Sequence, residues 1–96
     1  MTLDDALTTL EAHTETLRGF KVEALYVFGS VARGEAEDDS DVDLLVEFSE
    51  PVGLFAFARL QRFLEEILAT RVDLATPSAL RDSMRNDVLR EAVRAA

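Results

Sequence analysis

Residues 41–48 constrain the fold more than any other part of this sequence, because apolar and acidic side chains alternate along them. Successive side chains of a β-strand point to opposite faces, so the alternation predicts a strand with one apolar face. Asp41 and Asp43 share the other face and can converge on one ligand without backbone strain. The apolar face is formed by Val42, Leu44, Val46 and Phe48, whereas Leu45 lies on the side of the two aspartates.

Helices and two further strands are predicted around this strand. Thr2 and Asp5 resemble a capping box, leucines recur at helical spacing after them, and Gly19 supplies a stop signal. In chain order the sequence predicts a helix over residues 2–19, a strand over 22–28, a helical turn over 30–33, a loop over 34–40, the strand over 41–48, a helix over 54–70, a strand over 71–75 and a last helix. We expect one α+β domain over residues 1–96.

The last helix is predicted to start at Ser78, whose side chain is a good N-cap. Its buried face consists of Leu80, Met84, Val88, Leu89, Ala92 and Val93.

Composition and charge exclude several classes of function. The sequence has no Cys, which removes disulfides, thiolate zinc sites and cysteine nucleophiles, and fits a reducing compartment such as the cytoplasm. No apolar run approaches the roughly 20 residues of a membrane-spanning helix, and the first residues do not resemble a signal peptide. A formal net charge of −9 opposes nucleic-acid binding, which depends on clustered Lys and Arg. The same charge favours a basic protein partner or divalent cations.

Three aspartates form the candidate metal site. Mg²⁺ prefers hard oxygen ligands and is commonly held by a few carboxylates together with the phosphate oxygens of a substrate. Asp41 and Asp43 supply two such carboxylates from one strand. Asp73 lies within the short apolar strand over residues 71–75, where a carboxylate is costly to bury unless a cation compensates its charge. Together they favour phosphoryl or nucleotidyl chemistry.

A candidate phosphate-binding turn follows the first predicted strand. Gly29 lets the backbone approach a phosphate closely, and Ser30 adds a hydroxyl beside the free N–H groups of a helical turn. Arg33, about one turn further on, supplies a positive charge for the same anion.

Residues 29–48 read GSVARGEAEDDSDVDLLVEF, and this stretch resembles the minimal nucleotidyltransferase (MNT) branch of the DNA polymerase beta-like superfamily. The signature of that branch is Gly-Ser, ten residues and then Asp-x-Asp. It falls on Gly29, Ser30, Asp41 and Asp43, and the third catalytic carboxylate falls on Asp73 of the segment RVDLAT. Arg33 and Ser40 also match the residues that are usual at these positions of the motif. Both are therefore candidate nucleotide contacts.

The resemblance implies a polymerase beta-like nucleotidyltransferase fold, with a mixed β-sheet of about three strands and flanking helices. It implies that Asp41 and Asp43 bind two Mg²⁺ ions that clamp the triphosphate of ATP, while Asp73 assists the second ion and the attacking hydroxyl. It also implies a protein partner. Many short members of the branch are antitoxins that neutralise a HEPN-domain ribonuclease toxin by adding AMP to a toxin tyrosine, so we expect a hetero-oligomer with such a toxin.

Structural alternatives compete with several of these assignments. Asp39, Asp41, Asp43 and Glu50 occupy positions one, three, five and twelve of an EF-hand calcium loop, but Leu44 occupies the sixth position, where that loop requires glycine. The acidic run can also be a solvated loop, and Ser40 can serve only to end it. Asp73 can face water from an edge strand. Arg33 can pair with Glu35 or Glu37 at the surface.

Two groups of side chains are assigned structural roles. The arginines of the last helix are interspersed with acidic residues, which favours a solvated, salt-bridged face over a phosphate site; they are Arg81, Arg85, Arg90 and Arg94. Phe55, Phe57 and Phe63 have helical spacing and are expected in the core or in a subunit interface.

Two functions from different classes lead, and a third possibility is a template-independent transferase that acts on RNA or on a small antibiotic, although the acidic charge opposes the RNA version. The first is an Mg²⁺-dependent enzyme that transfers AMP to a protein hydroxyl. The second is a catalytically silent antitoxin that neutralises its partner by binding alone.

Overall fold

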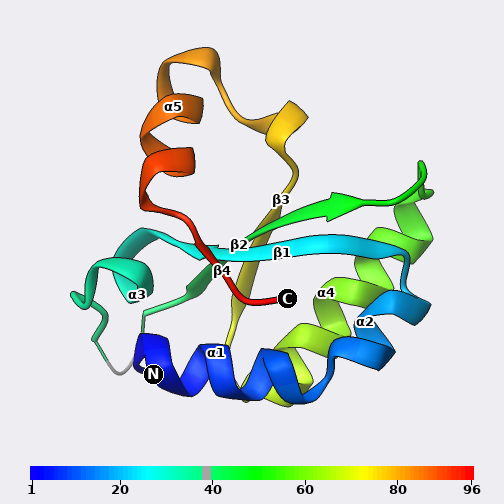
Figure 1. Cartoon of the computed structure of the whole chain (residues 1–96), viewed down its shortest axis with the longest axis horizontal. Coiled ribbons are helices and arrows are strands. Elements are labelled where there is room, and N and C mark those ends of the chain that lie inside the picture. The colour runs from blue at the N-terminus through cyan, green and yellow to red at the C-terminus, as the bar shows by residue number, and fades with distance from the viewer. Residues whose placement is uncertain (38–39) are drawn as a thin grey trace.

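A four-stranded mixed sheet forms the centre of the computed structural model, which describes residues 1–37 and 40–96 (Figure 1). The strand order is β3-β2-β1-β4; β1 is antiparallel to β2 and β4, and β2 is parallel to β3. The elements are α1 (Leu3–Ala12), α2 (Thr14–Gly19), β1 (Val22–Phe28), α3 (Gly29–Arg33), β2 (Val42–Phe48), α4 (Leu54–Leu68), β3 (Val72–Ala75), the 3₁₀ turn η1 (Pro77–Ala79), α5 (Asp82–Glu91) and β4 (Val93–Arg94). Asp39 of the EF-hand alternative lies outside the described residues.

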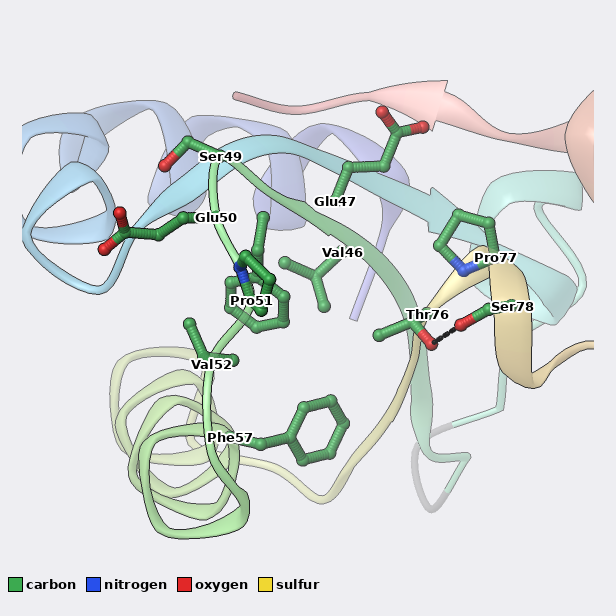
Figure 2. Close-up of a pocket in the computed structure, with 11 residues that line it drawn as sticks. Val46, Glu47, Ser49, Glu50, Pro51, Val52, Phe57, Thr76, Pro77 and Ser78 are labelled. Carbon is green, nitrogen blue, oxygen red and sulfur yellow. Dashed lines mark hydrogen bonds between the residues drawn. The ribbon is translucent and has the colours of Figure 1, made fainter.

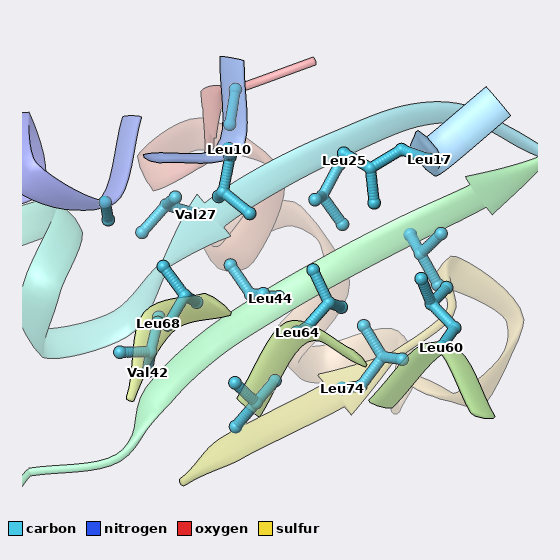
Figure 3. Close-up of a cluster of buried hydrophobic side chains, with 14 of the residues drawn as sticks. Leu10, Leu17, Leu25, Val27, Val42, Leu44, Leu60, Leu64, Leu68 and Leu74 are labelled. Atoms are coloured by element: carbon cyan, nitrogen blue, oxygen red, sulfur yellow. The ribbon is translucent and has the colours of Figure 1, made fainter. Parts of the chain in front are cut away.

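The two faces of the sheet are covered differently. In Figure 1, α1, α2 and α4 lie on one face, and α5 lies on the other. The core fills the first face, where the alternate residues Val42, Leu44 and Val46 of β2 are fully buried. They pack with β1, β3 and the helices through Leu10, Leu17, Leu25, Val27, Leu60, Leu64, Leu68 and Leu74 (Figure 3). The alternation of β2 thus places its acidic side away from the core, as the sequence predicts.

The predicted N-terminal helix is two helices that meet at His13. Its start is confirmed, because the side chain of Thr2 accepts a hydrogen bond from the backbone N–H of Asp5 at 3.1 Å. The break follows from local competition for carbonyl groups. The hydroxyl of Thr14 donates to the carbonyl of Glu11 at 2.8 Å, and the N–H of His13 donates to the carbonyl of Leu10 at 3.1 Å.

The C-terminal region differs most from the sequence prediction. The last helix begins at Asp82 rather than at Ser78, because Leu80 and Arg81 adopt extended backbone conformations after η1. Val88 is buried as expected, whereas Met84 is 50% exposed and Leu89 is 47% exposed.

A fourth strand was missed by the sequence analysis. Val93, assigned to the last helix, belongs to β4, where it pairs with Val27 of β1. Without β4 the free edge of β1 would present unpaired N–H and C=O groups, and pairing with the C-terminal residues satisfies them. Helical periodicity in the C-terminal residues alone does not reveal that they pair with the edge of a strand far away in the sequence.

The amphipathic helix α4 covers the sheet with Leu60, Leu64 and Leu68. Phe57 and Phe63 pack against the core, whereas Phe55 is 83% exposed. Within residues 1–37 and 40–96, no helix combines the length and the apolar surface needed to cross a lipid bilayer.

Candidate functional site

Two of the predicted aspartates lie side by side on neighbouring strands. Asp43 of β2 and Asp73 of β3 are register partners in the parallel pair. Their backbones are therefore about 4.8 Å apart and their side chains leave the same face of the sheet. Asp43 is half-buried, and Asp73 on the edge strand is exposed. Asp73 does face solvent from an edge strand, but it does so on the side of the sheet that carries Asp43.

Electrostatics place Asp41 in the same group. Burial raises the pKa of the Asp43 carboxyl, the negative charges of Asp73 and Asp41 raise it further, and the Arg33 guanidinium lowers it. The placement of the residues agrees with these charges, because Asp73 is the register partner of Asp43 and Asp41 lies directly before β2. The acidic group is thus a site where negative charges repel one another in the absence of a cation.

Gly29 lies directly against the carboxylate of Asp43. The φ angle of Gly29 is 71°, in the left-handed region that favours glycine. The antiparallel register of β1 and β2 pairs Phe28 with Asp43, which brings the following residue beside the same side chain. A Cβ atom on Gly29 would overlap Oδ2 of Asp43. Glycine at this bend therefore makes room for the carboxylate, a role that the sequence analysis did not foresee.

Arg33 ends α3 and is held by two carboxylates. Its Nε donates to Oε2 of Glu35 at 3.0 Å, and its Nη1 donates to Oε2 of Glu91 at 3.0 Å. Both hydrogen bonds raise the pKa of the guanidinium, which is fully charged. The surface pair with Glu35 was one of the alternatives; the pair with Glu91 was not anticipated, because residues 58 positions apart give no local signal.

The two predicted serines differ in their contacts. Ser30 is the second residue of α3 and is partly buried; its carbonyl accepts the backbone N–H of Glu35 at 2.8 Å. The hydroxyl of Ser40 accepts the backbone N–H of Glu37 at 2.9 Å. This contact with the backbone before β2 agrees with the structural alternative for Ser40, and its contact with a nucleotide stays a prediction.

A hollow of about 330 Å³ opens beside Asp43, between α3 and α5. It is bounded by Phe28, Gly29, Arg33 and Asp43 on the side of the sheet and by Met84, Asp87, Val88 and Glu91 on the side of α5. The half-buried carboxylate of Asp43 thus lies where the apolar and the acidic side chains that line this hollow meet.

A wider hollow of about 530 Å³ lies at the other end of β2 (Figure 2). It is lined by Val46, Glu47, Phe48, Ser49, Glu50, Pro51, Val52, Phe57, Thr76, Pro77 and Ser78. Figure 2 shows Phe57 and Val46 directed toward it and Glu47 directed away. None of the predicted site residues lines this hollow, so its size alone does not make it the site of the chemistry.

Two of the four arginines that the sequence assigned to the last helix lie on α5 and form surface ion pairs, as predicted. The assignment to the helix is wrong for the other two, because Arg81 precedes α5 and Arg94 belongs to β4. Arg85 pairs with Asp82 at 3.9 Å, and Arg90 pairs with Asp87 at 3.3 Å. Such pairs contribute little and leave no concentrated positive charge for a phosphate.

The acidic group fits a divalent cation that arrives with its substrate. In the described parts of the chain, no three acidic or histidine side chains already enclose one metal position. Mg²⁺ does not need such a cage, because it is usually bound by one or two carboxylates, by water and by the phosphate oxygens of a substrate. The hard donors Asp43, Asp41 and Asp73, whose mutual repulsion a cation would relieve, match that preference.

A model of the nucleotidyltransferase domain family matches residues 10–95 of the chain. The protein adenylyltransferase MntA of Thermococcus cleftensis is 46% identical over 94 residues, which cover 97% of this chain and 95% of that protein.

Solved structures show the same similarity. One that is assigned to the minimal nucleotidyltransferases superimposes with a TM-score of 0.83 at 43% identity, covering 97% of this chain and 95% of that chain. A chain in the complex of tri-AMPylated Shewanella oneidensis HEPN toxin with MNT antitoxin superimposes with a TM-score of 0.68 at 19% identity, covering 95% of this chain and 71% of that chain. The second similarity is one of fold alone.

Proposed function

The chain belongs to the nucleotidyltransferase domain family, and on that premise we propose that it transfers AMP from ATP to a tyrosine hydroxyl of a HEPN-domain toxin. Its sheet and flanking helices form the polymerase beta-like nucleotidyltransferase fold that the motif implies, with a fourth strand added. The observation that carries the proposal is the register pairing of Asp43 with Asp73, on the sheet face that lies beside the Gly29 bend.

Asp41 and Asp43 hold the divalent ions in this proposal, and Mg²⁺ is the expected metal. When bound, Mg²⁺ neutralises the triphosphate and stabilises the charge that develops on the departing pyrophosphate. Asp43 is held in place for this task, because Gly29 leaves room for its carboxylate and β1 and β3 flank its strand. Asp41, which is exposed and lies directly before β2, completes the pair.

The remaining residues of the motif position the nucleotide and the acceptor. Ser30 and the bend at Gly29 face the phosphates, and Arg33 contributes a positive charge beside them. The acceptor oxygen attacks the α-phosphorus, the new P–O bond forms as the bond to pyrophosphate breaks, and Asp73 accepts the hydroxyl proton. Asp73 suits this role because it is exposed to an incoming group yet lies next to Asp43.

A protein acceptor fits the surface of the chain better than a nucleic acid does. The net charge of −9 opposes a polyanion. Leu54 and Phe55 at the start of α4 are 80% and 83% exposed, and adjacent apolar side chains of this kind favour contact with another protein. The absence of Cys agrees with the reducing cytoplasm, where we place the reaction.

Incubation of the purified chain with ATP labelled at the α-phosphate, Mg²⁺ and its HEPN partner tests the proposal. We expect label on a tyrosine of the partner, and no label when EDTA removes the metal. A Tyr→Phe substitution in the partner is the matched control for the acceptor. If no nucleotide and no divalent ion yields labelled partner, catalysis is rejected.

The same assay separates the enzyme from the catalytically silent antitoxin. The double variant Asp41→Asn/Asp43→Asn keeps the size and polarity of both side chains and removes their charges. If the double variant still neutralises the partner at equal expression, binding alone is the function.

A further inference from the structure

Glu91 is the last residue of α5, and its side chain reaches across to α3. Its Oε2 accepts a hydrogen bond from Nη1 of Arg33 at 3.0 Å. Glu35 accepts from Nε of the same guanidinium, also at 3.0 Å. The first contact links two helices far apart in the sequence, whereas the second is local.

The contact with Glu91 contributes little to folding stability. The side chains of Arg33 and Glu91 are 43% and 38% exposed, and ion pairs that are exposed to solvent are weak because water screens them. Neutralising the charge of Arg33 does not require Glu91 either, since Glu35 is already bound. What the second carboxylate adds is orientation.

A guanidinium is planar and has donors on three nitrogens. Two carboxylates on Nε and Nη1 fix the plane of the Arg33 group. Among residues 1–37 and 40–96, no acceptor is hydrogen-bonded to Nη2, which can therefore serve a further acceptor. Arg33, Glu91, Gly29 and Asp43 all border the same hollow, and the charge of Arg33 acts on the Asp43 carboxyl. The oriented guanidinium therefore lies at the edge of the acidic group.

We propose that Glu91 is a positioning residue that holds the Arg33 guanidinium in the orientation in which it binds the phosphate groups of the incoming nucleotide. The inference rests on the proposed function, because it requires a nucleotide at Asp43 and Gly29. It assigns a role in nucleotide binding to α5, which the sequence motif does not include. Glu91 acts through Arg33 and takes no part in the transfer itself.

Calorimetric titration of the Mg²⁺ complex of a non-hydrolysable ATP analogue into three variants tests the proposal. Glu91→Ala removes the acceptor and should weaken binding about fivefold, the upper range for an exposed charged contact. Glu91→Gln keeps an oxygen acceptor without the charge and should stay within about twofold of the wild type, because orientation is retained. Asp82→Ala is the matched control: it removes a carboxylate from the same helix that pairs with Arg85 and is not among the residues that line the hollow.

Each outcome decides between orientation and charge. Weaker binding by Glu91→Ala with rescue by Glu91→Gln supports the proposal. Unchanged or tighter binding by Glu91→Ala overturns it, and so does equal weakening by both Glu91 variants. If the wild type binds no nucleotide, the proposed function fails as well; if the wild type binds and the variants match it, only the role of Glu91 fails.

Kinetics and NMR exclude a merely structural effect. Phosphate contacts made equally in the ground state and the transition state change KM rather than kcat, so Glu91→Ala should raise the KM for ATP and leave kcat within about twofold. The Nη1–H resonances of Arg33, which donates to Glu91, should be sharp in the wild type and in Glu91→Gln, and should broaden or exchange faster in Glu91→Ala. A variant that lowers kcat instead, with the Arg33 resonance unchanged, contradicts the proposal.

Discussion

The two faces of β2 serve different purposes, although they alternate residue by residue along one strand. On the face toward α1 and α4, Val42, Leu44 and Val46 are fully buried in one continuous core. On the face toward α5, Asp43 lies among carboxylates that raise its pKa. The apolar face supplies stability, which lets the other face keep repelling charges next to one another. A small domain with one core can therefore carry a destabilising site if the core and the site lie on opposite faces of the same strand.

The largest expected effect is on chemistry and comes from the acidic face. Asp43→Asn should lower the rate of AMP transfer about 1,000-fold, since a lost metal ligand removes several kcal/mol of charge stabilisation. The unfolding temperature without divalent ions should not fall, because the substitution removes a charge that two neighbours repel. Labelled transfer assays and thermal unfolding by circular dichroism measure the two effects. If Asp43→Asn lost activity only because it unfolds, the acidic face would affect stability as the apolar face does, and the two faces would not differ.

On the apolar face, substitution of Leu44, which is next to Asp43 in the chain, should mainly reduce stability. Leu44→Ala should reduce the free energy of unfolding by about 2–5 kcal/mol, because it leaves a cavity where no solvent enters. Urea denaturation measures the loss. Glu47→Ala, on the other face of the same strand, is the control and should change stability by less than about 0.5 kcal/mol. Similar losses in the two variants would mean that the faces do not differ in their contribution to stability.

Two glycines with similar backbone angles sharpen the comparison further. The φ angles of Gly29 and Gly34 are 71° and 73°, so alanine is strained at both positions. Gly34→Ala should cost about 1 kcal/mol, since no atom lies near its Cβ. Gly29→Ala should cost about 2 kcal/mol or more and should also impair transfer, because the methyl group overlaps Asp43. Equal losses in both variants would show that Gly29 does not make room for the carboxylate.

The smallest expected effect is on the pH dependence of stability. The folded chain binds the Asp43 proton more tightly than the unfolded chain does, because the pKa is raised in the fold. The resulting stability is complete below the pKa of an unfolded aspartate, about 3.9, and is lost as the pH rises through the higher pKa of the folded state. Without divalent ions, the stability of the wild type relative to Asp43→Asn should therefore decline over this window, and Mg²⁺ should reduce the decline. If the stability of the two proteins changed with pH in the same way, the raised pKa of Asp43 in the folded state would be contradicted.

The sequence predicted the parts of the fold whose signals are local. Alternation gave β2 and the face of Asp43, and the N-cap at Thr2 gave the start of α1. The C-terminal region was harder, because β4 forms in response to the free edge of β1 and leaves no periodicity of its own. The boundary at Asp82 also depends on two extended residues that composition does not distinguish from a first helical turn.

The candidate site divides in the same way. Spacing predicted Asp41 and Asp43 on one face of a strand, but β2 begins at Val42 and Asp41 lies directly before it. The motif selected Asp73, which the register of β2 and β3 brings to the face of Asp43. The contact of Gly29 with Asp43 and the bond of Glu91 to Arg33 depend on strand register and on helix placement. Neither has a signal in a single sequence, because the partners are set only when the chain folds.

Anomalous diffraction from crystals grown with Mn²⁺ and a non-hydrolysable ATP analogue tests the central claim most directly. We expect an anomalous peak in contact with the carboxylates of Asp41 and Asp43, on the side of Asp73 and next to the analogue's phosphates. A peak elsewhere on the surface, or bound nucleotide with no ion at these aspartates, would show that the acidic face of β2 is not a metal site.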